Sequence, residues 1–349
     1  MAELLTSLEL ADVRRDRAGN VLAGYAGSMD STPDGAAPFV ISAHLDTVFP
    51  PGTDVSVRRS GDLLKGPGIS DDARGLTSLV AVAEALKVAD LRTRAPLLFV
   101  ATVGEEGVGD LRGVKHLFGP EGDARRAAGF ISLDGAGMER VVLTGLGSRR
   151  YRVTVTGPGG HSWIDWGTPN PIHTLHALGL RLTQLDLRSD PRTTLTIART
   201  GGGKSINAIP QLAWMEIDTR SSDYDEVGGL ERRIRSTVTD VARDSGLDIE
   251  VEEIGNRPGG ATDMDSRLAK AAIAATRALG YEPVPALSST DANIPMSLGI
   301  PAVTLGCGGD AGKAHTTDEW YRNDRGPDGI VRALCTVLLA AGLVDESSG

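Results

Sequence analysis

The stretch APFVISAHLD, residues 37–46, decides the fold class of this chain. Its apolar run is typical of a strand that is buried on both faces of a sheet. Two later stretches have the same form, APLLFVATVGEE at 95–106 and AGFISLDG at 128–135. In all three, the apolar run gives way to carboxylates or a histidine. The sequence therefore predicts three buried strands with polar residues at their ends.

A helix is predicted between the first two of these strands. In GLTSLVAVAEALKVADL, apolar residues recur at helical spacing, namely Leu76, Leu79, Val80, Ala83 and Leu86. Strands that alternate with helices indicate an α/β fold whose sheet is covered on both faces. Ligands of such sheets bind at the carboxyl ends of the strands. The polar residues of this chain are predicted at that edge.

The pattern changes near residue 148. The stretch RRYRVTVTG, 149–157, alternates polar and apolar residues, as a strand with one buried face does. Helix, strand, strand, helix and strand are predicted after it, which is the order of a split βαβ unit. A helix, a strand and a closing helix then resume the first pattern. We therefore predict an α/β domain in two parts, 1–147 and 257–349, interrupted by a smaller α+β domain at 148–256.

Composition limits the classes of partner. The chain has 349 residues and a formal net charge of −10, which argues against binding to nucleic acid or to an anionic membrane. The sequence shows neither a basic-then-apolar leader nor an apolar run that could span a bilayer. Cys307 and Cys335 lie far apart and form no CxxC, so neither a disulfide framework nor a cysteine-based zinc site is predicted. We expect a cytoplasmic protein.

A glycine-rich run at 198–210, ARTGGGKSINAIP, looks at first like a phosphate-binding loop. Such a loop needs a helix after it, so that the helix N-terminus meets the phosphate. Here Pro210 and a β-type pattern follow Lys204 and leave no room for a helix. We therefore predict a turn between two strands, with Asn207 available for a polar role. A nucleotide-dependent enzyme is kept as an alternative from another class.

Acidic residues and histidines gather at the predicted strand ends and in one late loop. They are His44, Asp46, Asp71, Asp72, Glu105, Glu106, Asp134 and His315. Taken singly, each is better explained as a helix cap, a surface pair or a solvated turn. Taken together at one edge of one sheet, so many carboxylates would repel one another without cations between them. The set therefore predicts a site for hard or borderline divalent metal ions.

Several ordered motifs then carry a family resemblance. They are ISAHLDTV, GPGISDDARG, TVGEEG, ISLDG, GPGGHSW, INAIP with MEIDTR, and GKAHTTDEW. Together they resemble the co-catalytic dizinc metallopeptidase family of peptidase T, glutamate carboxypeptidase, succinyl-diaminopimelate desuccinylase and acetylornithine deacetylase, and the peptidase T-like branch most. The resemblance covers nearly the whole chain. It implies a metal-bearing catalytic α/β domain interrupted by a ferredoxin-like lid domain that often dimerises, so a homodimer is expected.

The resemblance also implies a metal-ligand set. Asp71 would bridge two divalent ions, with His44 and Asp134 completing one and Glu106 and His315 completing the other. A bridging carboxylate holds two cations roughly 3.5–4 Å apart, where both can share one attacking water. Two zinc ions are expected, and carboxylate-rich sites of this kind also accept cobalt or manganese.

Three further roles near the metals follow from the same resemblance. Glu105 resembles the general base, which takes a proton from the attacking water and passes it to the leaving amine. Asp46 resembles the partner that orients the His44 imidazole or tunes its metal. The peptide bond between Asp71 and Asp72 is expected to be cis.

Five other residues match substrate-side positions of the family. His161 resembles a histidine that reaches across a dimer to stabilise the oxyanion, with a plain turn histidine as the alternative. Asn207 and Arg220 resemble lid residues that grip a substrate carboxylate or the oxyanion. Thr290 and Asp291 match a loop near the substrate.

The predicted function is metal-dependent hydrolysis of amide bonds in short peptides, of the aminopeptidase or dipeptidase type. An aspartate at position 134 is associated with that branch of the family, and a glutamate with carboxypeptidases and deacylases. An N-acyl amino acid deacylase that uses the same dizinc site is the alternative within this chemistry. A metal-binding scaffold without catalysis is the alternative outside it, and the non-ligand carboxylate of Glu105 argues against that.

Overall fold

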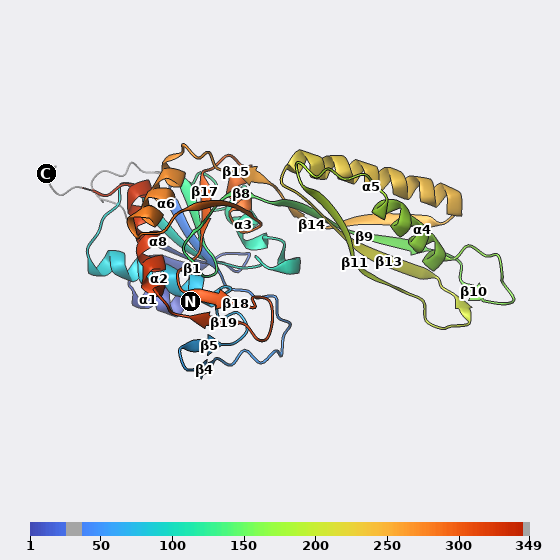
Figure 1. Ribbon diagram of the computed structural model, residues 1–349, viewed down its shortest axis with the longest axis horizontal. Coiled ribbons are helices and arrows are strands. Elements are labelled where there is room, and N and C mark those ends of the chain that lie inside the picture. Colours follow the sequence, from blue (N-terminus) through green and yellow to red (C-terminus); the bar gives the residue numbers. More distant parts are fainter. Residues whose placement is uncertain (26–36, 345–349) are drawn as a thin grey trace. The chain divides into compact units, whose positions relative to one another are not determined.

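The computed structural model describes residues 1–25 and 37–344. The chain forms two compact units: unit 1 comprises Met1–Gly145 and Gly260–Gly349, and unit 2 comprises Leu146–Gly259. Figure 1 labels helices and strands of both units. Within the described residues, no helix is both long and apolar enough to cross a membrane.

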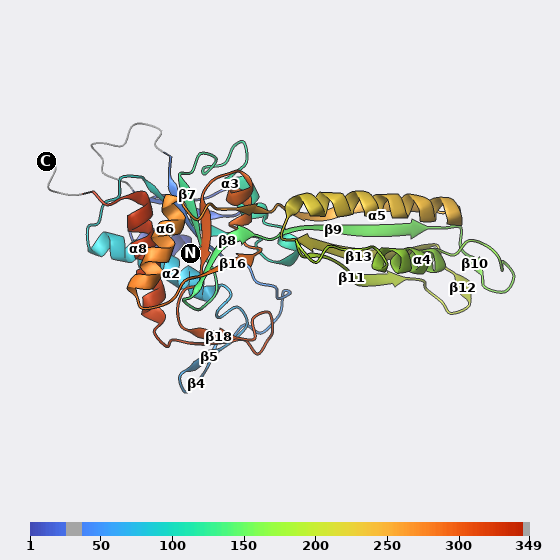
Figure 2. The ribbon, with the colours of Figure 1, turned by 45° about the horizontal axis from the view of Figure 1, so that its top comes forward.

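Unit 1 is built on a nine-stranded mixed sheet (Figure 2). Along the sheet its strands are β1 (Ala11–Arg15), β2 (Val21–Tyr25), β6 (Leu97–Thr102), β3 (Phe39–His44), β7 (Gly129–Leu133), β17 (Ala302–Leu305), β8 (Arg140–Gly145) and β15 (Gly260–Ala261), with β16 (Val284–Ser288) also paired to β8. Strand β3 lies parallel to β6 and β7, and β17 lies parallel to β7. The three strands predicted from the sequence thus lie side by side, as expected of an α/β fold.

Helices cover both faces of this sheet. Consecutive residues of β3 point to opposite faces, so Ile41 belongs to one apolar core and Val40 to the other. The first core also takes residues from α1 (Ala2–Ser7), α2 (Ala73–Val88), α6 (Arg267–Ala278) and α8 (Gly326–Ala341). The second takes residues from α3 (Arg112–Leu117) and α7 (Asn293–Ser297). The predicted burial of β3 is confirmed, because all six of its residues are buried.

A small second sheet of unit 1 was not predicted from the sequence. Its strands are, in order, β18 (Asp310–Gly312), β19 (Trp320–Arg322), β5 (Leu63–Lys65) and β4 (Arg58–Ser60), all antiparallel. Each strand has only three residues, which is too short for a hydrophobic period to show. The sheet places the segment just before Asp71 beside the loop that contains His315.

Unit 2 has the predicted order β-α-β-β-α-β. Its four-stranded antiparallel sheet has the order β11 (Thr193–Gly202), β13 (Leu212–Ser221), β9 (Gly147–Thr156) and β14 (Asp248–Arg257). Helices α4 (Pro171–Thr183) and α5 (Tyr224–Ser245) pack on the sheet through a third apolar core. A two-stranded ribbon pairs β10 (Gly160–His161) with β12 (Ala208–Ile209).

The glycine-rich run, residues 198–210, lies in unit 2 and extends from the end of β11 through β12. Strand β11 ends at Gly202, and residues 203–211 lead through β12 into β13 without forming a helix. Gly203 adopts a φ of +76°, a left-handed conformation that glycine tolerates without steric cost. The predicted turn between strands is confirmed, and the helix N-terminus that a phosphate loop requires is missing from this described segment.

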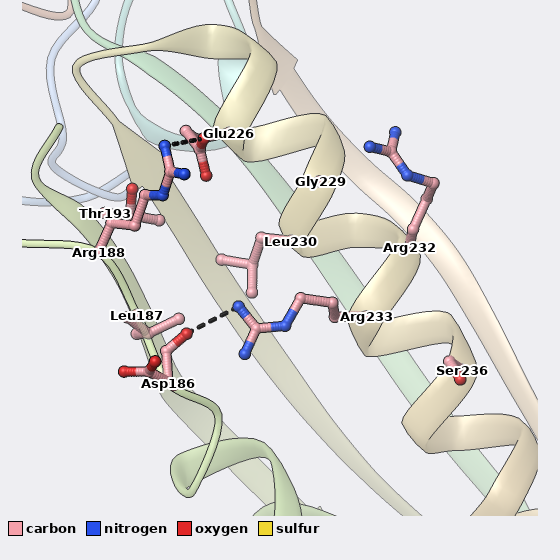
Figure 3. A pocket seen from close by; sticks show the side chains of 10 residues that line it. All are labelled: Asp186, Leu187, Arg188, Thr193, Glu226, Gly229, Leu230, Arg232, Arg233 and Ser236. Atoms are coloured by element: carbon pink, nitrogen blue, oxygen red, sulfur yellow. Dashed lines mark hydrogen bonds and ion pairs between the residues drawn. The ribbon is translucent and has the colours of Figure 1, made fainter. Parts of the chain in front are cut away.

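Unit 2 also carries a surface groove of about 620 Å³ between α5 and the loop before β11 (Figure 3). Two interactions join its walls: Arg188 Nη1 lies 2.8 Å from Glu226 Oε1, and Arg233 Nη1 donates to the Asp186 carbonyl oxygen at 2.7 Å. Two of the basic groups in the groove therefore already have partners. None of the predicted site residues lines it.

Candidate metal centre

His44 is the last residue of β3 and is almost fully buried. Its Nδ1 lies 2.9 Å from the backbone carbonyl oxygen of Asp46. Because a carbonyl oxygen can only accept a hydrogen bond, Nδ1 must carry the proton. In the neutral imidazole, Nε2 is then left with its lone pair, which is the form that binds a metal ion. Nε2 faces the carboxylate of Asp71.

Asp71 lies between two histidines. Its Oδ1 is 2.9 Å from His44 Nε2, and its Oδ2 is 3.1 Å from His315 Nε2. His315 Nε2 is also 3.1 Å from Glu106 Oε1. Each oxygen of one carboxylate thus faces a different imidazole, which is the arrangement expected of a carboxylate that bridges two cations.

Three overlapping sets of side chains bring potential metal-ligand atoms within 4.8 Å of one another. The sets are His44 with Asp71 and Asp134, Asp71 with Glu106 and His315, and His44 with Glu105 and Glu106. The first two sets share Asp71 and comprise the five ligands expected from the sequence. The donors are imidazole nitrogens and carboxylate oxygens, which suit zinc and similar divalent ions. The residues present therefore fit a metal pair.

The pKa shifts in the cluster also favour bound cations. Burial disfavours the imidazolium form of His44, but the charge of Asp72 and the hydrogen bond to Asp71 raise its pKa well above the ordinary value. Burial raises the pKa of Asp134 and of Glu106, and the nearby charge of Asp71 raises both further. Ionising these carboxyl groups together is therefore disfavoured when no further positive charge is near them. Divalent cations between them would supply the missing positive charge.

The carboxylate of Asp46 holds the neighbouring strand end rather than the His44 ring. Its two oxygens accept hydrogen bonds from the backbone N–H groups of Gly104, Glu105 and Glu106 at 2.7, 3.1 and 2.9 Å. The contact with His44 is made by the backbone carbonyl of Asp46 instead. One residue thereby positions the imidazole with its main chain and the Glu105–Glu106 pair with its side chain.

Asp72 joins three parts of the site. Its carboxylate accepts from the N–H of His44 at 3.0 Å, of Gly75 at 3.0 Å, where it caps α2, and of Gly135 at 3.2 Å. Gly75 must be a glycine, because a Cβ there would lie 2.4 Å from the carbonyl oxygen of Leu133. The peptide bond between Asp71 and Asp72 is cis, as the resemblance implied.

Glu105 follows the end of β6 and is 6% exposed. A carboxylate oxygen of Glu105 lies within 4.8 Å of ligand atoms of both His44 and Glu106. The Asp46 carboxylate fixes the Glu105 main chain. The predicted base therefore lies at the edge of the ligand cluster on a held backbone.

The predicted substrate residues of unit 2 lie on different elements. His161 is exposed on β10, and its Nδ1 accepts from the N–H of Trp163 at 3.2 Å and, at the long distance of 3.4 Å, from that of Ile164. Its Nε2 must then carry the proton and is a donor. Arg220 on β13 binds Asp218 through Nε at 2.7 Å, so a substrate carboxylate would compete with Asp218 for it. Asn207 is exposed, and its side-chain oxygen accepts from Ser205 Oγ.

Thr290 and Asp291 are buried in unit 1, with 5% and 1% of their surface exposed. Thr290 Oγ1 is 2.7 Å from Thr304 Oγ1, and Asp291 Oδ2 accepts from Thr102 Oγ1 at 2.5 Å. Burial raises the pKa of Asp291 to about 6. Their side chains contact β17 and β6, and the position near a substrate that the resemblance implied for them stays a prediction.

One buried carboxylate of the site was missed in the sequence. Glu319 lies four residues after His315 and is fully buried, and its side chain binds the segment that leads to Asp71. Its polar surroundings, HTTDEWY, are typical of an exposed loop and gave no sign of burial. Only its spacing from His315 could have drawn attention to it.

The chain matches a known protein family and a protein of known name. The model of "Peptidase family M20/M25/M40" matches residues 40–339. The succinyl-diaminopimelate desuccinylase of Corynebacterium glutamicum is 26% identical over 294 residues, which are 81% of this chain and 76% of that protein.

Two solved structures share the fold. Aminopeptidase PepT of Bacillus cereus has a TM-score of 0.75 at 21% identity, over 98% of this chain and 91% of its own. A tripeptidase of Staphylococcus aureus has a TM-score of 0.78 at 22% identity, over 97% and 91%. With a family match that spans most of its length and both units, the chain belongs to peptidase family M20/M25/M40 and is a metallohydrolase.

Proposed function

We propose that this protein hydrolyses amide bonds in short peptides with a pair of divalent metal ions, as an aminopeptidase or dipeptidase. The observation that carries the proposal is the position of Asp71, whose two carboxylate oxygens face two different histidines. In this assignment His44 and Asp134 would hold one ion, Glu106 and His315 would hold the other, and Asp71 would contribute to both.

Zinc fits the mixed nitrogen and oxygen donors, and cobalt or manganese would also suit them. When bound, such a metal pair polarises the amide carbonyl and makes water a stronger nucleophile at neutral pH. The protein supplies the remaining groups. Glu105 takes a proton from the attacking water and delivers it to the leaving amine, because it lies at the cluster without belonging to either of the two assigned ligand sets. Asp46 keeps Glu105 in place through the backbone.

Unit 2 is proposed to act as the lid and dimerisation domain. There, His161 would donate its Nε2–H to the oxyanion that forms on the substrate, either in its own chain or in a second copy. The backbone N–H of Trp163, which occupies Nδ1, supports this assignment by setting the tautomer. Arg220 and Asn207 would bind a substrate carboxylate or the oxyanion.

Replacing His161 tests that part of the proposal. We expect His161→Ala to lower kcat by roughly 10²–10³-fold, the usual cost of one lost oxyanion donor, with metal content unchanged. His173→Ala is the matched control, because His173 is also an exposed histidine of unit 2. Equal steady-state kinetics for both variants would remove His161 from the mechanism.

The second candidate function is deacylation of N-acyl amino acids. The desuccinylase among the relatives favours it, since the name of that protein describes removal of an acyl group. The same metal pair and the same base would serve, because both reactions hydrolyse an amide bond. The two functions differ in the group on the carbonyl side of this bond, which is an amino acid residue in a peptide and a simple acyl group in an N-acyl amino acid.

The deciding experiment is to measure metal content per chain together with hydrolysis of di- and tripeptides and of N-acetyl and N-succinyl amino acids. Two metal ions and peptide cleavage are the expected result. Two metal ions with deacylation alone would replace the first function by the second. A protein that binds no metal after reconstitution with zinc, cobalt or manganese would refute both.

A further inference from the structure

We propose that Glu319 is a positioning residue that fixes the bridging carboxylate of Asp71 relative to His315. The inference rests on the proposed metal centre and assigns a function to a residue outside its ligand set. It starts from the main chain of residues 66–71, between β5 and α2, which forms neither helix nor strand. The N–H groups of such a segment need other acceptors when they are buried.

Glu319 supplies these acceptors. Its Oε2 accepts from Gly68 N at 2.7 Å, and its Oε1 accepts from Ser70 N at 2.8 Å, Ser70 Oγ at 2.6 Å and Asp71 N at 3.0 Å. The side chain is fully buried, so these bonds are shielded from water. Hydrogen bonds to an ionised acceptor are roughly twice as strong as those between neutral groups. One carboxylate therefore fixes the backbone up to and including Asp71.

The main chain of Glu319 makes a second connection to the same segment. Its carbonyl oxygen accepts from Gly66 N at 3.0 Å, and the next residue, Trp320, pairs with Lys65 in the small sheet. Glu319 N donates to Thr316 O at 3.1 Å, which closes the turn after His315. Both the backbone and the side chain of Glu319 thus tie the His315 loop to the Asp71 segment.

The His315 loop needs such support. His315 and Lys313 have φ values of +64° and +58°, in the left-handed region that residues with a side chain rarely adopt. Such conformations persist where the surrounding structure determines them. The close approach of His315 Nε2 to Asp71 Oδ2, 3.1 Å, joins residues that are 244 positions apart in sequence. Through its bonds to both segments, Glu319 holds His315 close to Asp71.

Asp46 and Asp72 act in a comparable way at the other segments. The Asp46 carboxylate accepts from the N–H groups of Gly104, Glu105 and Glu106. The Asp72 carboxylate accepts from those of His44 and Gly135. Glu319 does the same for the segment that ends at Asp71. Three carboxylates outside the proposed ligand set thus accept backbone hydrogen bonds at or next to the proposed ligands.

The test compares Glu319→Gln with Asp318→Asn as the matched control. Asp318 is the neighbouring residue, its side chain is 76% exposed, and its carboxylate forms a surface ion pair with Lys313. Glutamine keeps the shape of Glu319 but turns an NH₂ group toward backbone donors. We expect its affinity for Co²⁺, followed by visible absorption in competition with a chelator, to fall by roughly 10–100-fold. The control should bind as the wild type does.

Thermal unfolding of the metal-free proteins separates positioning from simple stability. Unchanged affinity in Glu319→Gln, with or without a lower Tm, would overturn the inference while leaving the proposed function intact. If this variant does not fold, Ser70→Ala decides instead, because it removes one of the four bonds and leaves the carboxylate. A roughly 3- to 10-fold weaker affinity would then support the inference, and wild-type affinity would overturn it. Wild-type protein that binds no Co²⁺ would overturn the proposed function and the inference together.

Discussion

Glu105→Gln should retain two metal ions per chain and lose peptide hydrolysis by roughly 10²–10⁴-fold, the usual contribution of a general base. Glutamine has nearly the same size and shape as glutamate, so the 6% exposed position can accept it. The backbone contact with the Asp46 carboxylate is kept as well, because it uses the main-chain N–H. Only the ability to take up a proton is lost.

The informative comparison is with Glu106→Gln. The two residues are adjacent and both have buried or half-buried carboxylates in the same cluster, but only Glu106 belongs to the set with Asp71 and His315. We expect Glu106→Gln to weaken metal binding at one site, measured as metal content after dialysis. Glu105 also reaches His44 and Glu106 in a third set, so it could serve as a ligand instead. Loss of metal from Glu105→Gln would assign it that role and refute the role of base.

The fold of unit 1 was predictable where the sequence has a period or a long apolar run. Strands β3 and β6 each have six buried residues, which are apolar or small apart from the terminal His44 and Thr102, and α2 has apolar residues at helical spacing. Polar residues directly after such strands lie at the carboxyl ends of a parallel sheet. The sequence alone therefore predicts His44 and Glu105 at the same edge of the sheet.

Other parts of the site depend on contacts that leave no local pattern. The small sheet of β4, β5, β18 and β19 brings the His315 loop beside Asp71 through pairs of three-residue strands. The four hydrogen bonds of Glu319 run to residues about 250 positions earlier in the chain. Asp46 was expected to orient the His44 imidazole or tune its metal, yet only the fold shows that its backbone carbonyl oxygen, and not its carboxylate, contacts the ring. Sequence spacing identifies candidate ligands, whereas long-range pairing decides what holds them.

Asp71 is the residue whose loss should affect the protein most. Removal of its carboxylate in Asp71→Ala takes away the oxygens that face both His44 and His315. Binding should therefore weaken at both metal positions. We expect this variant to retain no stoichiometric metal after dialysis, and to lose more activity than the roughly 10–100-fold caused by loss of an outer hydrogen-bond partner of a ligand. Metal analysis and single-turnover hydrolysis would measure the two effects.

Asp71→Asn gives a sharper test of bridging, because an amide keeps one acceptor oxygen and replaces the other by an NH₂ group that cannot bind a cation. If Asp71 holds two ions, asparagine can serve only one of them, so this variant should bind at most one metal ion per chain. His315→Ala is the matched control, since it removes a ligand from one position and should also leave one ion. Two tightly bound ions in Asp71→Asn would show that each position is complete without a shared carboxylate, and the proposed bridge would then be wrong.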